Sequence, residues 1–452
     1  MASDWCELTL EGSMDAIIDY RGKTPKKTDS GIPLITAKII KGGRIETVNE
    51  FISNDDYDSW MRRGIPKKGD IVMTTEAPLG EIAQLDGRKI ALAQRVITLR
   101  GKKDVLDNTF LKYLMISEYV QHQLDGRGIG TTVKGIKQSE LRKVILKFPS
   151  LPEQKAIAHI LGSLDDKIEL NRQMNETLEA MAQTLFKSWF VDFDPVIDNA
   201  LQAGNPIPDE WQARAEQRRA VMNQDSDNQA IRALFPDAFE FTEEMGWIPE
   251  GWSVKCFSEI ANLDTTSVKP NSEPEKIWEH FSIPAFDINA SPVFDTGESI
   301  KSNKYKVNEA AILVSKLNPE TERIWWVDIQ DSNSAVCSTE FMQFIPSNPN
   351  HRAFVYSLLR SQYFQSEILS RVTGSTGSHQ RTQPKSVAVI EIIKPSDKLV
   401  NKFSRVACNW KLRVPGNIEQ NSRLSKLRDT LLPKLMSGEL RIADATALIE
   451  EV

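Results

Sequence analysis

A long predicted helix with a repeating apolar seam constrains the fold of this chain more than any other feature. Residues 150–190 open on Ser150-Leu151-Pro152-Glu153, a capping-box pattern that satisfies the first free NH groups of a helix. Apolar residues then recur at alternating steps of three and four. The seam consists of Ile157, Leu161, Leu164, Ile168, Leu178, Ala182, Leu185 and Trp189, with Asn171 and Asn175 as polar positions. A helix about 60 Å long with one apolar stripe favours a partner helix, although a long core helix would show the same pattern.

The second half of the chain carries a similar seam at residues 396–440. The tetrad Ile168-Glu169-(x)-Asn171 falls on Ile418-Glu419-(x)-Asn421, 250 positions later. Pro415-Gly416 is expected to interrupt this second helix, and Pro433 and Gly438 to end it. Two such seams can pair antiparallel. The predicted pairing residues are Ile157, Leu161, Leu164, Ile168, Asn171, Leu178 and Leu185 on the first helix, and Ile418, Asn421, Leu424 and Leu431 on the second.

The regions that precede the two helices also repeat, at an offset of 244. A predicted helix at 108–124, a small polar loop and a strand follow one another in both copies, and Val144-Ile145-Leu146 falls on Ala388-Val389-Ile390. Short apolar runs between turn signals predict a mixed α/β domain, in which Asp86-Gly87 has the pattern of a hairpin turn.

These patterns predict an α+β protein with two similar mixed α/β domains, separated by two long helices that form an antiparallel coiled coil with pseudo-two-fold symmetry. The segment between the repeats is predicted to be a partly ordered surface connection with a short helix from Asp209 to Met222. The predicted boundaries are 1–149 for the first domain, 150–190 for the first long helix, 191–246 for the connecting segment, 247–395 for the second domain, 396–440 for the second long helix and 441–452 for a C-terminal tail.

Composition limits the class of protein. The formal net charge is −6, but residues 191–250 hold 4 Lys+Arg against 13 Asp+Glu, whereas residues 1–150 hold 24 against 20. The acidity is therefore local, and the first domain is mildly basic. The four cysteines are far apart and form no CxxC pair, which favours reduced thiols in a cytoplasm. No apolar run is long enough to cross a membrane, and the N-terminus lacks a signal-peptide pattern.

Motifs for catalysis are weak. Arg21-Gly22-Lys23-Thr24 ends like a phosphate-binding loop, but Ile17 stands where the first glycine is needed. The glycine-rich stretch 126–130 follows a predicted helix rather than a strand, and the five histidines form no HExxH pattern. Asp70, Glu76 and Glu81 could form a nuclease metal site only if the fold gathered them. We therefore expect neither a catalytic nor a metal site in this chain.

The sequence instead offers basic and polar positions suited to nucleic acid. Arginine and glutamine can read base edges, and a Gly-Thr-Thr loop can offer NH groups and hydroxyls to phosphates. Each position alone is also typical of a solvated surface, but similar loops occur in both repeats, at residues 130–132 and 374–376. The candidate DNA contacts are Lys26, Lys27, Arg62, Arg63, Thr74, Thr75, Gln94, Arg95, Arg127, Thr131, Thr132 and Lys134 in the first domain, and Lys316, Arg323, Arg371, Ser375, Thr376, Ser378, Gln380 and Arg381 in the second.

The chain resembles the specificity subunits of type I restriction-modification systems. The residues that carry the resemblance are Leu151-Pro152-Glu153-Gln154-(x2)-Ile157, Leu164-Asp165-(x2)-Ile168, Phe190-(x)-Asp192-Phe193-Asp194-Pro195, Ile248-Pro249-Glu250-Gly251-Trp252 and the Gly130-Thr131-Thr132 loop. The second helix departs from the family in lacking a second Glu-Gln start.

The resemblance implies two target-recognition domains that each read half of a split double-stranded DNA site. It also implies partners: two modification subunits that use S-adenosylmethionine, and restriction subunits that use ATP and Mg²⁺. The chain itself would have no cofactor. Two alternatives stay open: the recognition part of a fused restriction or methylation enzyme, and a coiled-coil scaffold without a DNA role.

Overall fold

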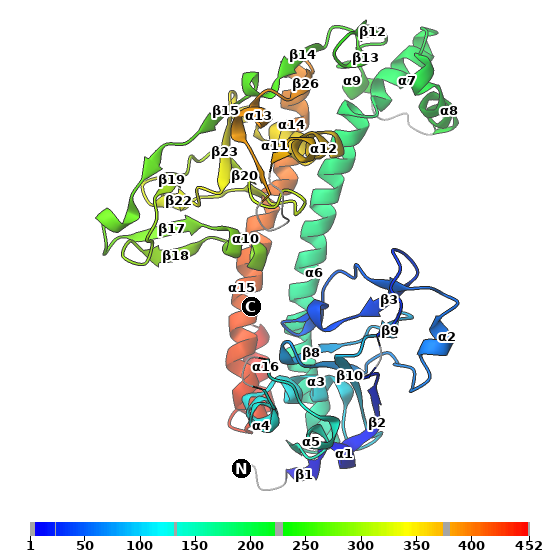
Figure 1. Cartoon of the computed structure of the whole chain (residues 1–452), viewed down its shortest axis with the longest axis vertical. Helices are drawn as coiled ribbons and strands as arrows, with labels where there is room; N and C mark the ends of the chain where they lie inside the picture. Colours follow the sequence, from blue (N-terminus) through cyan, green and yellow to red (C-terminus); the bar gives the residue numbers. More distant parts are fainter. Residues whose placement is uncertain (1–4, 23, 131–132, 222–228, 374–379, 451–452) are drawn as a thin grey trace. The chain divides into compact units, whose positions relative to one another are not determined.

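The computed structural model describes residues 5–22, 24–130, 133–221, 229–373 and 380–450. The chain forms two compact units (Figure 1). Unit 1 comprises Met1–Arg172 with Ile418–Val452, and unit 2 comprises Gln173–Asn417. Each unit therefore takes in part of both long helices as well as one globular region. Among the described residues, no helix combines the length and the apolar character that crossing a bilayer would need.

Unit 1 is built on a four-stranded antiparallel sheet in the order β2-β10-β7-β8. A second sheet has the order β6-β3-β9, with β3 and β9 parallel, and β1 pairs with β11. The strands are β1 (Cys6–Thr9), β2 (Met14–Asp19), β3 (Ile32–Ile35), β4 (Ile40–Lys41), β5 (Arg44–Ile45), β6 (Phe51–Ile52), β7 (Ile71–Thr75), β8 (Leu79–Gln84), β9 (Ala91–Leu92), β10 (Val96–Gly101) and β11 (Ile145–Phe148). The hairpin predicted at Asp86-Gly87 is wrong: the turn exists, with Gly87 at φ 95°, but β8 pairs with β7 and β9 pairs with β3.

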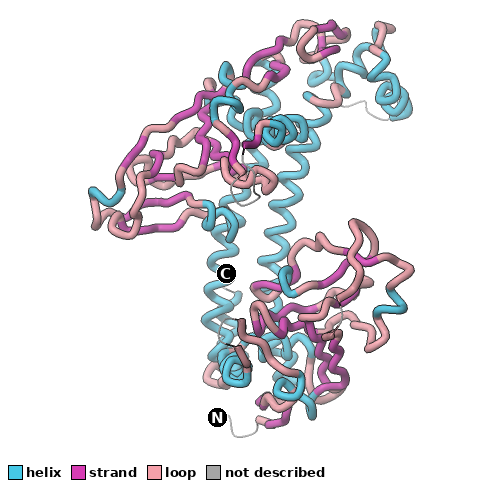
Figure 2. The backbone as a smooth tube through the Cα atoms, viewed as in Figure 1, coloured by secondary structure: helices cyan, strands magenta, loops and turns pink. Residues whose placement is uncertain are grey.

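The helices of unit 1 cover this sheet, and Figure 2 shows them as cyan segments beside the magenta strands. They are α1 (Leu10–Ser13), α2 (Tyr57–Trp60), α3 (Asn108–Ile116), α4 (Glu118–Arg127), α5 (Gln138–Leu141), α6 (Leu151–Phe190), α15 (Arg413–Met436) and α16 (Ile442–Glu450), of which α6 and α15 extend into unit 2. The single helix predicted at 108–124 is two helices. Ser117 separates them because its backbone is extended (φ −59°, ψ 146°) and its hydroxyl donates to the Leu114 carbonyl at 2.6 Å.

The Glu153-Gln154 start of α6 fastens the long helix to the sheet region. The Gln154 side chain is 1% exposed, and its Nε2 donates to the carbonyls of Val105 (3.0 Å) and Pro149 (2.9 Å). Its Oε1 accepts from the NH of Asp107, the residue that caps α3. These three hydrogen bonds of the buried Gln154 side chain give a physical reason for the Glu-Gln motif, which carries part of the family resemblance.

The two long helices run antiparallel where they meet in unit 1. Ile157, Leu161, Leu164 and Ile168 of α6 are buried in the same cluster as the α15 residues Leu424, Leu431 and Leu435. Beyond them, Nδ2 of Asn171 donates to Oδ1 of Asn421 at 2.9 Å. The predicted fold class, with paired long helices, is confirmed.

Unit 2 repeats the topology of unit 1. Its four-stranded antiparallel sheet has the order β15-β23-β20-β21, β14 pairs with β26, and a five-stranded sheet β16-β19-β22-β17-β18 again contains one parallel pair, β17 with β22. The strands are β12 (Phe239–Thr242), β13 (Gly246–Pro249), β14 (Ser253–Cys256), β15 (Ala261–Asp264), β16 (Ser267–Val268), β17 (Ile277–Phe281), β18 (Val293–Thr296), β19 (Lys304–Lys306), β20 (Ile312–Ser315), β21 (Ile324–Trp326), β22 (Ala335–Cys337), β23 (Phe341–Pro346), β24 (Val372–Thr373), β25 (Arg381–Thr382) and β26 (Glu391–Lys394).

The helices of unit 2 are α7 (Asp194–Ala203), α8 (Gln212–Val221), α9 (Gln229–Arg232), α10 (Ile283–Asn289), α11 (Arg352–Leu359), α12 (Gln362–Ser370), α13 (Pro384–Ala388) and α14 (Asp397–Lys411). Among them, α11 and α12 follow α3 and α4 at the offset of 244, whereas α13 and α14 follow α5 and α6 at 246. The strand predicted at Ala388-Val389-Ile390 lies later, at β26, because Ala388 ends α13. Two extra residues between α12 and β26 therefore raise the offset from 244 to 246.

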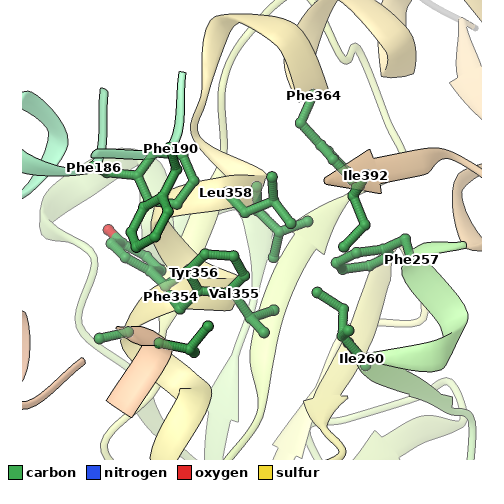
Figure 3. Close-up of a cluster of buried hydrophobic side chains, with 14 of the residues drawn as sticks. Phe186, Phe190, Phe257, Ile260, Phe354, Val355, Tyr356, Leu358, Phe364 and Ile392 are labelled. Carbon is green, nitrogen blue, oxygen red and sulfur yellow. The ribbon is translucent and has the colours of Figure 1, made fainter. Parts of the chain in front are cut away.

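An aromatic cluster forms the core of unit 2 (Figure 3). Phe186 and Phe190 from the end of α6 pack against Phe354 of α11, with ring centroids 5.6 and 5.1 Å apart. Phe257 lies between β14 and β15 and packs on Phe364 of α12 at 4.7 Å. These contacts join the sheet, α11, α12 and the end of α6 into one core.

The segment at 191–246 is more ordered than the sequence predicts, at least where the structure describes it. Helices α7 and α8 are fastened by two bidentate ion pairs: Arg214 with Asp194 at 2.7 and 2.8 Å, and Arg218 with Asp198 at 2.9 and 2.5 Å. The predicted helix from Asp209 to Met222 begins with a 3₁₀ turn at Asp209–Trp211 and continues as α8. Asp194 and Asp198, two acidic residues of this segment, are thus part of a folded structure.

The second long helix breaks close to Pro415, as predicted, but at Leu412, three residues to its N-terminal side. Helix α14 ends at Lys411 and α15 begins at Arg413, so Pro415 lies in the first turn of α15. The reason is local: proline cannot donate to the carbonyl of residue i−4, which is Lys411, and its ring clashes with that carbonyl. The prediction that Pro433 ends the helix is wrong, because Pro433 lies inside α15 and the helix stops at Met436, before Gly438 at φ 73°.

Candidate nucleic-acid interface

Three loops meet at one edge of the four-stranded sheet in unit 1. The loop after α4 closes on itself, because Ile129 and Gly135 exchange backbone hydrogen bonds of 2.8 and 3.0 Å. Its base then joins the end of β7, where the NH of Ile136 donates to the carbonyl of Thr75 at 2.9 Å. Gly130 is required there: its φ is 119°, and a Cβ atom would lie 2.2 Å from the Val133 carbonyl oxygen.

The turn between β9 and β10 completes the edge. The NH of Thr75 donates to the carbonyl of Arg95 at 2.9 Å. Across the same loops, Nε of Arg95 lies 2.7 Å from Oε1 of Glu76, and about half of each side chain is exposed. The β7–β8 loop, the β9–β10 turn and the loop after α4 thus present one half-exposed ion pair to solvent.

Unit 2 builds the same edge with the same backbone hydrogen bonds. The NH of Thr382 donates to the carbonyl of Lys316 at 3.1 Å, and the NH of Lys316 donates to the carbonyl of Glu340 at 2.8 Å. These bonds match Ile136 to Thr75 and Thr75 to Arg95 in unit 1. The loop after α12 is again closed by pairing, between β24 and β25, and the NH of Asn318 donates to the carbonyl of Gln380 at 3.0 Å.

In unit 2 the matching turn supplies the negative partner of the ion pair, whereas in unit 1 it supplies the positive one. Glu340 occupies the place of Arg95, and it accepts from Nε and Nη2 of Arg381 at 3.1 and 3.0 Å. Arg381 lies on β25, at the base of the loop after α12. Burial lowers the pKa of the neighbouring Lys316 ammonium, and the carboxylate of Glu340 works against that decrease.

Several predicted contacts come together at these two edges. Arg95, Gln94 and Lys134 lie in the converging loops of unit 1, where Lys134 also pairs with Asp125 at 2.6 Å. Lys316, Gln380 and Arg381 lie in the converging loops of unit 2. Five further predicted contacts lie outside the described residues: Thr131, Thr132, Ser375, Thr376 and Ser378.

Thr74 and Thr75 require a correction. Their side chains are 0% and 2% exposed, and the Thr74 hydroxyl accepts from the NH of Glu81 at 2.9 Å. Every residue of β7 is buried, so the strand is covered on both faces and offers no side chain to a ligand. Thr75 contributes to the edge through its backbone only.

Other predicted basic residues are held by protein partners. Arg63 donates from Nη1 to the carbonyls of Asp19 (3.1 Å) and Arg21 (2.7 Å). The Arg323 side chain is only 13% exposed and forms a bidentate pair with Asp287 at 2.6 and 3.0 Å. Arg371 bonds the carbonyl and the carboxylate of Glu367, one turn earlier on α12.

The remaining predicted contacts are surface positions of unit 1. Lys26 and Arg62 are exposed, and Lys27 is exposed and pairs with Glu50 at 2.7 Å. Arg127 is half-buried at the last position of α4.

The sequence missed two carboxylates and one arginine of the edge. Glu76 and Glu340 hold the exposed arginines, and Arg21 donates from Nη1 to the Ile136 carbonyl at 2.6 Å. The repeat itself carried a signal for Glu340 only, since β10 and β23 align at an offset of 245, which places Arg95 on Glu340.

The three carboxylates that could form a nuclease metal site each contact a different partner. Asp70 forms a bidentate pair with Arg100 at 2.8 and 2.6 Å, Glu76 pairs with Arg95, and Glu81 accepts from the NH of Gly42 at 3.0 Å. Within the described part of the chain, no three metal-ligating side chains are placed to share an ion.

Two repeated α+β modules, each with the same loop edge and each built onto a shared pair of antiparallel helices, define a class of modular recognition proteins. Known proteins show what this chain is similar to. Residues 9–180 match the family model described as the type I restriction modification DNA specificity domain. The chain is 27% identical over 395 residues to the type I restriction enzyme MjaIX specificity subunit of Methanocaldococcus jannaschii, a match covering 83% of this chain and 79% of that protein.

Two further relatives agree. The type I restriction enzyme HindI specificity subunit of Haemophilus influenzae is 26% identical over 408 residues, covering 83% of this chain and 87% of that protein. The crystal structure of the type I restriction-modification system S subunit from M. genitalium superposes with a TM-score of 0.53 at 17% identity, over 96% of both chains, and so shares the fold. Over most of its length this chain is therefore similar to specificity subunits of type I restriction-modification systems.

Proposed function

We propose that this chain is the DNA-sequence-recognition subunit of a type I restriction-modification complex. Unit 1 reads one half of a split site in double-stranded DNA, and unit 2 reads the other half. The observation that carries the proposal is the recurrence of the three-loop edge, with matching backbone hydrogen bonds, at Thr75–Ile136 and at Lys316–Thr382. A protein with two copies of one recognition edge is suited to a site with two parts.

The chemistry of the two edges suits DNA. Each edge presents a half-exposed arginine, the side chain that most often makes specific contacts with guanine in the major groove. Exposed Lys26 and Arg62 of unit 1 can add contacts to phosphates, which set the position of a protein on the duplex without reading its sequence.

The chain is non-catalytic on its own in this proposal, as specificity subunits generally are. Two modification subunits methylate adenine with S-adenosylmethionine, and restriction subunits cleave DNA with ATP and Mg²⁺. The chain selects the site for both reactions, and α6 with α14 and α15 provides the surface on which the partners assemble.

Mapping of methylated adenines tests this function. The active modification partner is expressed in cells without this chain and then with it. We expect one bipartite motif to appear only when the chain is present, with two defined half-sites and a fixed spacer.

The outcome that contradicts the proposal is equally clear. If the partner is active with another specificity subunit but yields no motif with this one, the chain does not direct it. Purified chain that binds S-adenosylmethionine would instead favour a fused enzyme. A chain that binds no DNA at any salt concentration would favour a scaffold.

A further inference from the structure

The two loop edges share their backbone but not the origin of their arginine. In unit 1 the guanidinium comes from the β9–β10 turn (Arg95), whereas in unit 2 the matching turn supplies the carboxylate (Glu340) and the arginine comes from β25 (Arg381). The side chains of Arg95 and Arg381 are nevertheless 51% and 49% exposed, and each is held by one carboxylate. Each edge thus presents an exposed guanidinium that a carboxylate holds, but the arginine comes from a different strand or turn in each unit.

Stability does not account for these pairs. Ion pairs at half-exposed positions are weak, because water screens the charges and two long side chains lose freedom. The backbone hydrogen bonds already fix the loops. The pair recurs at the same edge of both units with its charges exchanged. Binding of a ligand by the arginine explains this recurrence better than a contribution of the pair to folding.

The geometry leaves the arginines free to act. An arginine has five NH donors in a rigid planar fork. The contact with Glu76 uses Nε of Arg95, and the contacts with Glu340 use Nε and Nη2 of Arg381. Within the described part of the chain, no other partner engages the remaining donors of either fork, so they are available to a ligand. The carboxylate restricts the rotation of the guanidinium before the ligand arrives.

We propose that Arg95 and Arg381 each read one guanine, Arg95 in the half-site of unit 1 and Arg381 in the half-site of unit 2, with Glu76 and Glu340 as the residues that position them. This inference rests on the proposed function. A guanine presents two acceptors, O6 and N7, to the major groove, and a guanidinium fork can donate to both. Free swinging of the fork would weaken this selection, so the carboxylates set specificity rather than overall affinity.

The experiment uses the full chain with its modification partner on a library of duplexes in which each base of the wild-type motif is replaced in turn. Arg95→Ala is expected to relax one guanine position of one half-site, with discrimination falling by about 10- to 100-fold. Arg381→Ala is expected to do the same in the other half-site. The half-site that each variant leaves alone is its internal control.

The positioning residues have a separate readout. Glu76→Ala and Glu340→Ala are expected to lower the preference for the same guanines without lowering affinity for DNA in general. Glu76→Gln and Glu340→Gln are expected to lose less, because an amide oxygen still accepts from the guanidinium. A matched control is Arg88→Ala, which removes the exposed pair with Asp86 (2.6 Å) outside the edge and should leave the motif unchanged.

The outcomes separate this inference from the proposed function. If the wild-type chain gives no bipartite motif, the proposed function fails. If the motif is intact but Arg95→Ala and Arg381→Ala change no base preference, or weaken all sequences equally, or relax a base other than guanine, then this inference is overturned while the function stands. A thermal unfolding temperature equal to that of the wild type verifies that each variant is folded.

Discussion

Nδ2 of Asn171 donates to Oδ1 of Asn421 at 2.9 Å, and each asparagine ends a copy of the same Ile-Glu-(x)-Asn pattern, 250 positions apart. Nδ2 of Asn421 in turn donates to the carbonyl of Ile168 at 3.3 Å. In unit 2, Nδ2 of Asn417 donates to Oδ1 of Asn175 at 2.7 Å. Amide pairs within an apolar helix seam favour one register over its neighbours, since a shifted register would leave the amides without partners.

The first prediction concerns this pair. Asn171→Ala removes the donor to both Oδ1 of Asn421 and Oε1 of Gln420, the latter at 2.8 Å. We expect the free energy of unfolding of unit 1 to fall by about 1–2 kcal/mol, because polar groups are left unpaired at a largely buried position. Urea unfolding measures this, with the exposed Glu176→Ala on the same helix as control. Equal midpoints for the two variants would contradict a structural role for the pair.

The second prediction concerns the ion network of Asp165 in unit 1. Its carboxylate accepts from Nζ of Lys112 (2.5 Å), the hydroxyl of Tyr113 (2.7 Å) and Nη1 of Arg428 (2.8 Å). Asp165→Asn leaves two partly buried cations without their counter-charge. We expect a loss on the order of 3 kcal/mol, measured by urea unfolding at neutral pH. The control Asp429→Asn removes only the exposed partner of Arg428 and should cost much less.

The same network predicts a pH dependence. Burial alone would raise the pKa of the Asp165 carboxyl, but the Lys112 ammonium and the hydrogen bonds from Lys112, Arg428 and Tyr113 outweigh it and hold the pKa below its ordinary value. The group therefore adds stability above the pKa of an unfolded carboxyl, about 4, and this stability is lost as pH falls through the lower folded pKa. Thermal unfolding between about pH 6 and pH 3 should show a smaller acid loss for Asp165→Asn than for the wild type. Parallel curves would contradict the assignment.

The third prediction separates a structural arginine from the reading arginines. Arg323 is nearly buried and its fork is occupied by Asp287, so Arg323→Ala should lower the stability of unit 2 by about 1–3 kcal/mol. The methylated motif should keep every base, because the side chain has little exposed surface to offer. Thermal unfolding and methylation mapping check the two halves of this prediction, with Lys301→Ala, at an exposed site of unit 2, as control. A relaxed base in the motif would show that Arg323 reads DNA.

The helices were readable from sequence because their signals are local. The seam from Ile157 to Ile168 gave the buried face of α6, and the repeated Asn171 and Asn421 gave its partner. The second long helix lacks the Glu-Gln start, and the structure shows which residues replace it. Ser396 caps α14 by accepting from the NH of Leu399 at 3.4 Å, and Val400, 1% exposed, takes the place of the buried Gln154 at an offset of 246.

The candidate site was less readable because it depends on tertiary contacts. Composition flagged Arg95, Arg323 and Arg381 alike, but only the fold shows that Asp287 occupies Arg323. The two threonines of β7 looked polar in sequence and are core residues, since that strand is covered on both faces. Pairing of Glu76 with Arg95 and of Glu340 with Arg381 spans many residues and leaves no periodic pattern.

The last prediction tests how the paired helices act on the DNA site. The chain passes from unit 1 to unit 2 within the uninterrupted helix α6, between Asn171 and Asn175. Four residues inserted after Gln173, matched by four inserted after Glu419 in α15, preserve both asparagine pairs. They add about 6 Å to each helix, which is slightly more than one helical turn. The apolar residues of each seam therefore stay on nearly the same side of their helix. Methylation mapping should then show the same two half-sites with a longer spacer. An insertion in α6 alone is the control, because it breaks the register and should lower stability instead. A folded double-insertion chain with an unchanged spacer would contradict the role of the helices in setting the distance between the half-sites.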